Sequence, residues 1–493
     1  MQRKWAKAVG LLLCLLLMAS LAACTPRSSA PEEEGDQEGE TLLTTDIVIV
    51  GAGGTGLAAA ASAIEHGAEV IVLEKLAFTG GSTALSGGGI AATDTKFQRA
   101  EGIEDSKESW MELWKERQAT SNPDGMYPDY DFVDMFMDEA VITTEWMADT
   151  IGHKYARIEG FGLDPVRRLH FPERGGREVI ESLENYLKER GVEILTETPG
   201  KELLTNEDGD VIGVVAEGPD GERIVIEAKK VILATGGFAR NEDLLARFVP
   251  EVKGSSEITA AAAGSTGDGI LMAEKVGAAL YEEPWIIGLG VGTKVKGTDS
   301  LMMDWTKLYV NGEGKRFASE QMHYAIATNK IIEEGDVWIV MDSAEANADL
   351  IAAMEEAMPT DEVAKGDTLE ELAEAMGVPV ENFVATIEEY NQGAKTGKDA
   401  MGKDPEFVLP VEKAPFYAIK AHPKTMGTFG GVKTDEFYRV LRADGSVINN
   451  LYAGGECANK VLYNQVYMSG SAVQFALTSG RIAGEHAAKN LNN

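Results

Sequence analysis

A glycine-rich turn between two short β-branched runs sets the architecture of the N-terminal part of this chain. Residues 45–50 (TDIVIV) have the composition of a buried parallel strand. The turn GAGGTG follows, then a helical pattern at 57–66, a second strand pattern at 69–73, and Glu74, 18 residues beyond Gly56. In such a βαβ unit glycines let the backbone approach a pyrophosphate, the helix N-terminus faces its charge, and the acid binds ribose hydroxyls. The pattern therefore predicts a dinucleotide site formed by Gly51, Gly53, Gly54, Gly56 and Glu74.

Further glycine-rich segments extend this predicted site. Residues 78–90 form a second glycine loop, and a predicted strand at 230–233 ends in the residues ATGG. Residues 264–269 (GSTGDG) precede a predicted helix at 270–276, and residues 451–456 read LYAGGE. Together these motifs resemble the fumarate reductase and succinate dehydrogenase flavoprotein superfamily, over about residues 46–490.

The resemblance implies FAD as the cofactor. It implies that Glu74 binds the adenosine ribose, that loop 80–89 follows the pyrophosphate and isoalloxazine, and that Glu456 lies on the ribitol side. It also implies that residues 469–473 open a helix whose positive N-terminus faces the flavin N1/C2=O edge. Ser82 stands where membrane-bound relatives carry a flavin-linked histidine, so we expect non-covalent FAD. Beyond the first turn, the expected FAD-binding residues are Lys75, Gly80, Gly81, Ser82, Ser86, Gly87, Gly88, Thr235, Gly236, Gly237, Asp268, Gly455, Glu456, Ser471 and Val473.

The expected fold class is α/β, with a Rossmann-like FAD-binding domain of the GR2 type and an inserted α+β capping domain. Within the insert, the patterns predict a strand at 338–341, helices at 347–357, 369–376 and 380–390, and a polar loop at 391–404. The resemblance makes this insert a cap that closes over the flavin and excludes water. The predicted segments are a signal peptide (1–23), an acidic tether (24–44), the FAD-binding domain (45–284 and 428–493) and the cap (285–427).

The N-terminus has the features of a secretory signal. Three cations precede a short apolar run, which is followed by the residues LAAC ending at Cys24. The apolar run is shorter than the roughly 20 residues that span a bilayer, so it does not predict a transmembrane helix. The LAAC sequence resembles the bacterial lipobox, which implies that Cys24 is lipidated and holds the protein on the extracytoplasmic face of the cell membrane. The alternative is an ordinary cleaved signal in which Cys24 has no role.

Charge and cysteine content exclude several classes of protein. The 493 residues carry 45 lysines and arginines against 80 acids, a formal charge of −35, which repels nucleic acid. The three cysteines are too few for a four-thiolate metal site or an iron–sulfur cluster, and there is no haem-attachment motif. No metal site is predicted, and redox chemistry in this chain needs an organic cofactor.

Two tyrosines stand where the resemblance expects arginines. Fumarate reductases use one arginine as proton donor and a second as carboxylate clamp, and the spacing places Tyr324 and Tyr467 at these positions. Without guanidinium groups a buried dicarboxylate would stay uncompensated, so fumarate is not the expected substrate. Tyrosines at both positions resemble the 3-ketosteroid Δ1-dehydrogenases, which implies that Tyr324 exchanges the proton and Tyr467 binds a carbonyl oxygen. The resemblance also implies that the backbone at Gly470 and Ser471 contributes an N–H group to that carbonyl.

The function expected from the sequence is that of an extracytoplasmic, lipid-anchored FAD-dependent oxidoreductase. It reduces an activated C=C bond, of the enone or enoate type, by hydride transfer from flavin N5 with tyrosine as the proton donor. Two alternatives are a 3-ketosteroid-type dehydrogenase, which desaturates next to a ketone, and a flavin electron carrier without its own substrate. A chain without haem or iron–sulfur ligands needs a separate electron donor or acceptor at the membrane.

Overall fold

The computed structural model describes residues 41–164, 166–252 and 254–492, which belong to one compact unit. The predicted signal peptide, Cys24 and the tether up to residue 40 lie outside the described residues. Strand β1 (Thr41–Val50) begins inside the stretch predicted as tether, and its first residues already pair with β9 (Arg223–Leu233), for example Thr41 with Ile224. None of the helices formed by the described residues is long and apolar enough to span a membrane.

The largest sheet has a parallel centre built around β1. Strands β2 and β9 flank β1 in parallel, β6 continues beyond β2, and β16 lies parallel to β9. The helix α1 (Gly54–Glu65) connects β1 to β2, which confirms the predicted βαβ unit. The order is β15-β16-β9-β1-β2-β6, with β8 on β9 and β7 on β8; the remaining bounds are β2 Val70–Leu73, β6 Glu193–Leu195, β7 Gly200–Thr205, β8 Val211–Glu217, β15 Arg439–Leu441 and β16 Val447–Ala453.

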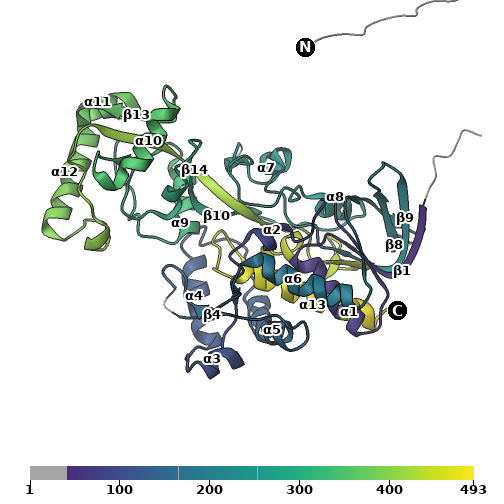
Figure 1. The fold of residues 1–493 in the computed structure, drawn as a ribbon. Helices are drawn as coiled ribbons and strands as arrows, with labels where there is room; N and C mark the ends of the chain where they lie inside the picture. Colours follow the sequence, from purple (N-terminus) through teal and green to yellow (C-terminus); the bar gives the residue numbers. More distant parts are fainter. Residues whose placement is uncertain (1–40, 165, 253, 493) are drawn as a thin grey trace, which may run out of the picture. The chain divides into compact units, whose positions relative to one another are not determined.

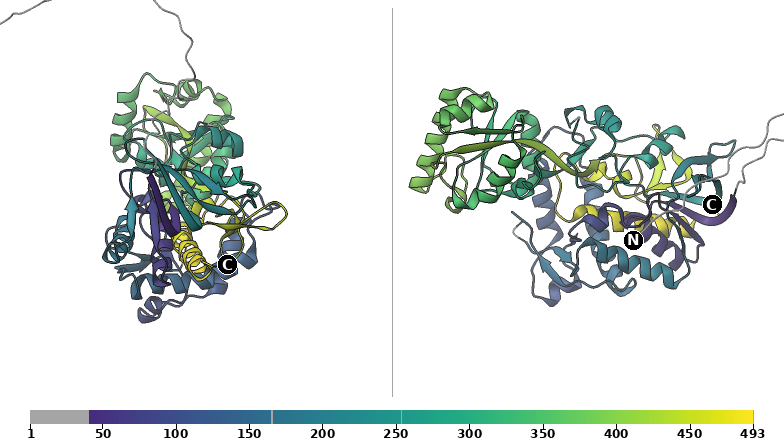
Figure 2. Two further views of the ribbon diagram at one scale, coloured as in Figure 1. Left: turned by 90° about the vertical axis from the view of Figure 1, so that its right-hand side faces the viewer. Right: turned by 45° about the horizontal axis from the view of Figure 1, so that its top comes forward.

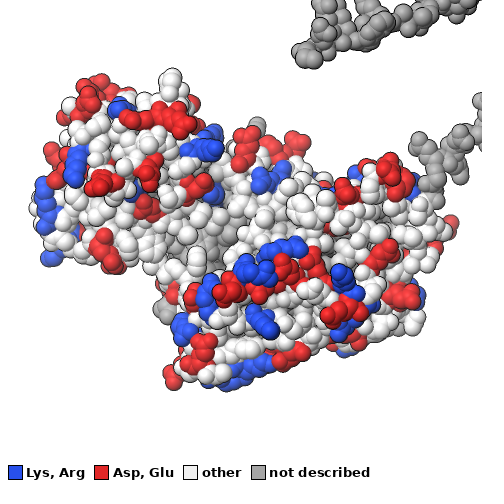
Figure 3. Space-filling model, viewed as in Figure 1, with Lys and Arg blue, Asp and Glu red and all other residues white. Residues whose placement is uncertain are grey.

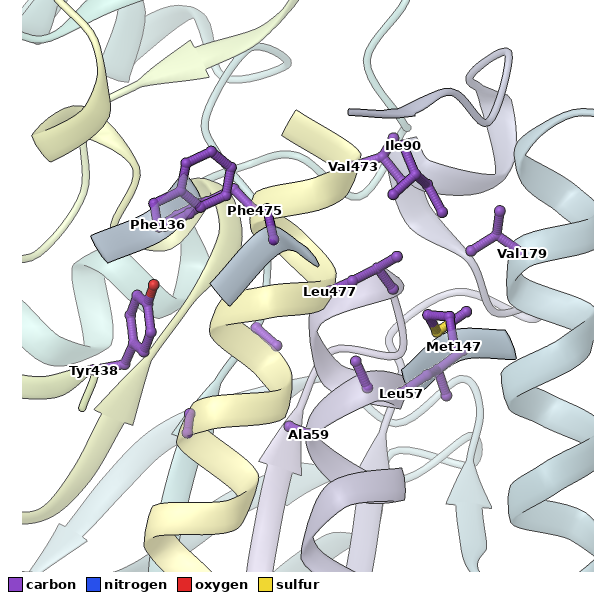
Figure 4. Close-up of a cluster of buried hydrophobic side chains, with 14 of the residues drawn as sticks. Leu57, Ala59, Ile90, Phe136, Met147, Val179, Tyr438, Val473, Phe475 and Leu477 are labelled. Atoms are coloured by element: carbon purple, nitrogen blue, oxygen red, sulfur yellow. The ribbon is translucent and has the colours of Figure 1, made fainter. Parts of the chain in front are cut away.

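Helices α1 and α13 (Ser471–Lys489) pack closely against one another beside this sheet (Figure 1). A Cβ atom at Gly480 would lie 2.2 Å from the Thr55 carbonyl oxygen, and one at Gly484 would lie 2.2 Å from that of Ala59. Glycine at these positions therefore allows the two backbones to touch. Figure 4 shows Leu57 and Leu477 from these helices among buried side chains of other elements, including Met147 and Val179.

The second sheet is built from the insert. Its order is β10-β14-β12-β11, with β13 also on β14, and all its pairs are antiparallel. Strand β14 is long: its first part pairs with β12 and β13, and its last part pairs with β10 next to the FAD-binding domain. In Figures 1 and 2 helices α10 to α12 gather around this sheet. The strands are β10 Trp285–Gly292, β11 Leu308–Asn311, β12 Val337–Met341, β13 Val363–Gly366 and β14 Phe416–Phe429.

The helices of the insert agree with the sequence patterns except at one end. α10 (Ala348–Ala357) and α11 (Leu369–Met376) match the predicted segments within a residue. α12 (Val380–Thr396) continues into the stretch predicted as a polar loop, which is a correction. Its last turn remains helical because Tyr390 and Gly393 are buried, and Gly397 ends it in a left-handed conformation.

A small sheet of β3 (Ile90–Ala91), β5 (Leu169–Phe171) and β4 (Arg157–Glu159) lies beside the start of α13. On the face in Figure 3, acidic and basic side chains are interspersed, without a broad basic surface among the residues drawn. The other helices are α2 Gly81–Leu85, α3 Lys96–Ala100, α4 Lys107–Gln118, α5 Tyr130–Asp149, α6 Gly176–Glu189, α7 Glu242–Phe248, α8 Asp268–Lys275 and α9 Tyr324–Glu334.

Candidate active site

A cavity of about 390 Å³ opens at the carboxyl ends of the parallel strands. Val50, Leu73 and Ala234 bring the ends of β1, β2 and β9 to its wall. The second glycine loop, the start of α13, β10 and the first residue of α9 complete the lining. Open α/β sheets bind their ligands at this edge, so the topology places a cofactor site where the glycine motifs predicted one.

The glycines of the first turn and of the second glycine loop have two separate functions. A Cβ atom at Gly51 would lie 2.3 Å from the Ala234 carbonyl oxygen, and one at Gly56 would lie 1.8 Å from that of Gly51, so both are needed for packing. At Gly53 and Gly81 a Cβ atom would meet nothing nearer than 3.9 Å and 3.6 Å, and both residues line the cavity. Their missing side chains leave backbone exposed to the cavity, which is the surface that a pyrophosphate needs.

Acidic residues lie where the FAD site requires hydroxyl-binding groups. Glu74 is buried, and its carboxylate oxygens accept hydrogen bonds from the backbone N–H groups of Ala52 (3.0 Å) and Leu76 (2.9 Å). These bonds fix the carboxylate and leave each oxygen a further lone pair for a ribose hydroxyl. Glu456 accepts from the N–H of Thr428 (3.1 Å), and burial raises its pKa to about 7. Lys75 and Asp268 are paired at 2.7 Å on the cavity wall.

The structure brings most of the expected FAD-binding residues together and places a few behind the wall. Gly237 and Gly455 pack against Glu456 and Thr55 respectively, and the Ser471 hydroxyl is bonded to Tyr463 (2.6 Å). Gly56, Gly80, Gly237, Gly455 and Ser471 do not line the cavity. The expected residues that do line it are Gly51, Gly53, Gly54, Glu74, Lys75, Gly81, Ser82, Ser86, Gly87, Gly88, Thr235, Gly236, Asp268, Glu456 and Val473.

Tyr324 and Tyr467 both line the cavity, with their ring centroids 6.2 Å apart. Tyr324 begins α9 in the insert, whereas Tyr467 precedes α13 in the FAD-binding domain, so the fold brings together residues far apart in sequence. Large apolar side chains also line the cavity, and the sequence analysis did not predict them. They are Phe161, Leu169, Phe171, Ile287, Leu289 and Met426. No regular pattern marks these residues, because they come from separate loops and strands.

A hydrogen-bond chain leads to the Tyr324 phenol. The Tyr324 Oη lies 3.0 Å from Ser469 Oγ, and His323 Nε2 lies 3.2 Å from the same oxygen. His323 Nδ1 accepts from the Ala325 N–H at the start of α9, so in the neutral imidazole the proton is on Nε2 and is donated to Ser469. Either hydroxyl of the Ser469–Tyr324 pair can donate, and when Ser469 is the donor the phenol proton of Tyr324 is free. The sequence gives one signal for Ser469, its position two residues after Tyr467.

Burial controls the ionisation of these side chains. It raises the pKa of Tyr324 well above the usual value for a phenol, and the neighbouring Tyr467 adds to this effect. Burial raises the pKa of Tyr467 to about 12, although the Ala472 N–H donates to its Oη at 3.3 Å. Burial also lowers the pKa of His323 to about 3. At neutral pH both tyrosines are therefore protonated and the imidazole is uncharged.

The hydrogen bond from Ala472 concerns a backbone contact that the resemblance implied. That contact was an N–H group from Gly470 and Ser471 to the substrate carbonyl. In this structure the Ala472 N–H, one residue further along, is directed to the Tyr467 oxygen. Because this oxygen accepts the bond, the Tyr467 proton stays free to be donated to a substrate. The Ala472 N–H is therefore bonded to the phenol, and the contact of the Gly470 and Ser471 backbone with a substrate carbonyl stays a prediction.

No arginine or histidine lines the cavity within the described part of the chain, and Lys75 at the far end is paired with Asp268. Arg168 and His170, which resemble flavin-proximal residues of relatives, lie outside the lining. Arg168 is fully buried against Asp105 (2.9 Å), and His170 lies 2.8 Å from the Thr95 hydroxyl. Both side chains have structural partners.

Comparison with known proteins agrees with this site. Residues 46–472 match the family described as FAD binding domain. The chain is 31% identical over 466 residues to the probable fumarate reductase Ifc3 of Shewanella frigidimarina, covering 91% of this chain and 75% of that protein. It is 31% identical to the urocanate reductase of Eggerthella lenta, covering 93% of this chain and 77% of that protein.

A solved structure of a similar protein has the same overall fold. The 3-ketosteroid-Δ4-(5α)-dehydrogenase of Rhodococcus jostii RHA1, in complex with 4-androstene-3,17-dione, superimposes with a TM-score of 0.72 at 26% identity. The match covers 94% of this chain and all of that chain (100%). The resemblance and the cofactor inferred from the motifs are confirmed: the chain belongs to the FAD binding domain family and is an FAD-dependent oxidoreductase.

Proposed function

We propose that this enzyme reduces a carbon–carbon double bond conjugated to an uncharged carbonyl group. The observation that carries the proposal is that two phenols, Tyr324 and Tyr467, lie on the cavity wall, and that no arginine or histidine of the described residues lines this cavity. Neutral donors suit a neutral oxygen, because no guanidinium or imidazole of the described residues lines the cavity to form a direct ion pair with a carboxylate.

The residues of the chain divide the reaction between them. FAD, when bound and reduced, supplies the hydride. Tyr467 donates a hydrogen bond to the carbonyl oxygen and so withdraws electrons from the double bond. Tyr324 donates its phenol proton to the carbon next to the carbonyl, and Ser469 stabilises the phenolate that remains. Apolar residues such as Phe161 and Met426 exclude water from the reacting atoms.

The protonation states favour reduction over the reverse reaction. Reduction requires a protonated Tyr324, whereas desaturation of a ketone requires its phenolate. Because burial raises the Tyr324 pKa well above the usual value, the protonated form dominates at neutral pH. The names of two similar proteins, a fumarate reductase and a urocanate reductase, point to the same direction. Without arginine at positions 324 and 467, however, fumarate itself is not the substrate that we propose.

Desaturation of a ketosteroid-like substrate is the second candidate function. The similarity to the 3-ketosteroid-Δ4-(5α)-dehydrogenase and the tyrosine pair both support it. A third candidate function is that of an electron carrier without its own substrate. The cavity lined by Tyr324 and Tyr467 argues against it, because a carrier needs no substrate cavity. Such a carrier would show no substrate-dependent reoxidation of its flavin.

The cellular setting that we propose rests on the N-terminal sequence. The signal-like segment and the LAAC motif support export and lipidation of Cys24, so that the enzyme stays at the extracytoplasmic face of the membrane. The three cysteines of the sequence provide no ligand set for an iron–sulfur cluster. Electrons therefore reach the non-covalently bound FAD from a separate donor at the membrane.

Anaerobic reoxidation of the flavin tests this function. The holoenzyme is reduced with dithionite and mixed with enones, enoates and steroid ketones, and the oxidised flavin spectrum is followed. Enones should reoxidise the flavin and yield the saturated ketone. Failure of every compound with an activated double bond would contradict the proposal, and reduction of FAD by a saturated steroid ketone would favour the second candidate.

A further inference from the structure

Arg117 is a buried cation without the partners that buried cations usually have. It lies in the last turn of α4, and only 6% of its surface is exposed. Its Nη1 has no hydrogen-bond partner among the described residues. Arg168 Nη1 is also without a hydrogen-bond partner, but the Nη2 of Arg168 lies 2.9 Å from the Asp105 carboxylate, whereas no carboxylate of the described residues forms an ion pair with Arg117. An unpaired buried guanidinium costs free energy of folding, so its presence requires an explanation.

The fold fixes the last turn of α4, which carries Arg117, against the segment that precedes Tyr467. Trp114 Nε1 donates to the Leu462 carbonyl at 3.0 Å, and Gln118 Nε2 donates to that of Val466 at 2.6 Å. Gln118 Oε1 also accepts from the Asn464 N–H at 2.8 Å. These bonds join the last turn of α4 to the segment that leads directly into Tyr467. The helix cannot shift to bring Arg117 into solvent without breaking them.

The charge of Arg117 acts on the proton-transfer residues. It lowers the pKa of Tyr324 and of His323, opposing the effect of burial on Tyr324. Burial lowers the pKa of Arg117 itself, and Asp164 is the first of the nearby charges that counter this. The other groups in this environment are Arg168 and Glu116 around Arg117, and Tyr463, Tyr467 and Ser469 around Tyr324.

We propose that Arg117 is a positioning residue whose unpaired charge stabilises the Tyr324 phenolate left after proton donation. This inference rests on the proposed function, in which Tyr324 is the proton donor. The donated proton goes to the substrate carbon, and the negative charge left on Tyr324 Oη is stabilised by the Ser469 hydroxyl and by the guanidinium. A carboxylate bonded to Arg117 would cancel this field, which explains why none is bonded to it.

The proposal predicts that removal of the Arg117 charge raises the unfolding temperature and lowers the reaction rate. In Arg117→Met the holoenzyme should unfold at a higher temperature, because an unpaired charge no longer has to be buried. The single-turnover rate of flavin reoxidation by an enone should fall about tenfold, since the phenolate loses its stabilising charge. Arg117→Lys keeps the charge and should restore most of the rate. Arg168→Met is the matched control: it leaves the buried Asp105 carboxylate without its cation, so it should lower the unfolding temperature.

A second readout separates this inference from the proposed function. 3-Fluorotyrosine at position 324 reports the state of the phenol by ¹⁹F NMR in the oxidised holoenzyme, without substrate. Its titration should move upward by about one pH unit in Arg117→Met, matching the tenfold rate effect, and should stay in place in Arg117→Lys. If no enone reoxidises the wild-type flavin, the proposed function fails, while this shift still tests Arg117. An unchanged fluorine titration, or an unfolding temperature lowered as in Arg168→Met, would overturn the inference.

Discussion

At the scale of single residues, the side chain at position 324 decides which substrate groups we expect the cavity to bind. A guanidinium at this site suits a carboxylate, whereas the phenol observed here is neutral and donates a single hydrogen bond. Its partner across the cavity, Tyr467, is also neutral. Under the proposed function, the phenols at positions 324 and 467 favour ketones and esters over dianions.

Replacing Tyr324 with phenylalanine should separate cofactor binding from turnover. The Tyr324→Phe protein should remain yellow and folded, because the ring still packs against Phe161. Its rate of enone-dependent reoxidation should fall about 10²–10⁴-fold, the usual contribution of a general acid. Tyr438→Phe is the control, since Tyr438 is buried with an unpartnered hydroxyl away from the cavity. Turnover retained in Tyr324→Phe would remove this residue from the mechanism.

The raised Tyr324 pKa gives the two directions different pH profiles. The phenol is the form needed for reduction and it persists until the pH approaches its raised pKa, so the reduction rate should stay level from about pH 6 to 9. Desaturation needs the phenolate, so its rate should rise with pH, by up to about tenfold per unit. Initial rates of reduction and of desaturation, measured from about pH 6 to 9, test the assignment of Tyr324 as the proton donor. A reduction rate that falls steadily above pH 7 would show that another group donates the proton.

Sequence and structure agree on Tyr324 and Tyr467 because fixed spacing from neighbouring motifs locates them. Ser469 and Arg117 could not be identified in the same way. The hydroxyl of Ser469 matters only because α9 begins opposite it, and Arg117 matters because α4 docks beside Tyr467. Both relations are long-range contacts, which local sequence patterns do not contain. Ser471 illustrates the opposite case, since its position suggested a cofactor contact but its hydroxyl is bonded to Tyr463.

At the scale of elements, the βαβ unit was the most predictable part of the chain. Strand, turn, helix and second strand each have a local pattern, and β1, α1 and β2 formed where these patterns lie. The ends of elements were less predictable: β1 begins before the predicted boundary and α12 ends beyond it. In both cases the extra residues are held by tertiary contacts, with β9 for β1 and around buried Tyr390 for α12.

The open space beside Gly53 gives a test of the first turn. In Gly53→Val the side chain would project into the cavity where the pyrophosphate is expected, so the protein should fold but lose FAD. Absorbance near 450 nm and the flavin content after gel filtration measure this loss. Gly312→Val is the matched control, because a Cβ atom there makes only ordinary contacts, the nearest at 3.6 Å, far from the cavity lining. A yellow Gly53→Val protein would contradict the placement of the cofactor.

At the scale of the whole molecule, the insert completes a site that the FAD-binding domain cannot form alone. The cavity takes Tyr324 and Leu289 from the insert, and Tyr467 and the glycine loops from the rest. The division into FAD-binding domain and cap rests on repeated glycine motifs and a change of pattern near residue 285, and it stays a prediction. The apolar lining was beyond prediction, because it depends on how β10 and the loop carrying Phe161 meet.

The lipid anchor proposed at Cys24 can be tested in cells. Replacement of Cys24 by serine should release the protein from the membrane fraction, because the lipid attachment residue is absent. Cys14→Ser is the control, since Cys14 lies within the predicted signal peptide and should leave the membrane association intact. Fractionation followed by immunoblotting measures both. If the Cys24→Ser protein is found in the membrane fraction to the same extent as the Cys14→Ser protein, another part of the chain or a binding partner holds it at the membrane.

The central claim is that neutral phenols select an uncharged carbonyl, and a matched ester and acid test it most directly. Reduced holoenzyme is mixed anaerobically with methyl cinnamate or with cinnamate, and the rate of flavin reoxidation is measured for each. The ester should react at least about tenfold faster, because among the described residues the only cation that lines the cavity, Lys75, is already paired with Asp268 and no arginine or histidine there can bind the carboxylate. A rate for cinnamate that equals or exceeds that of its methyl ester would contradict the account.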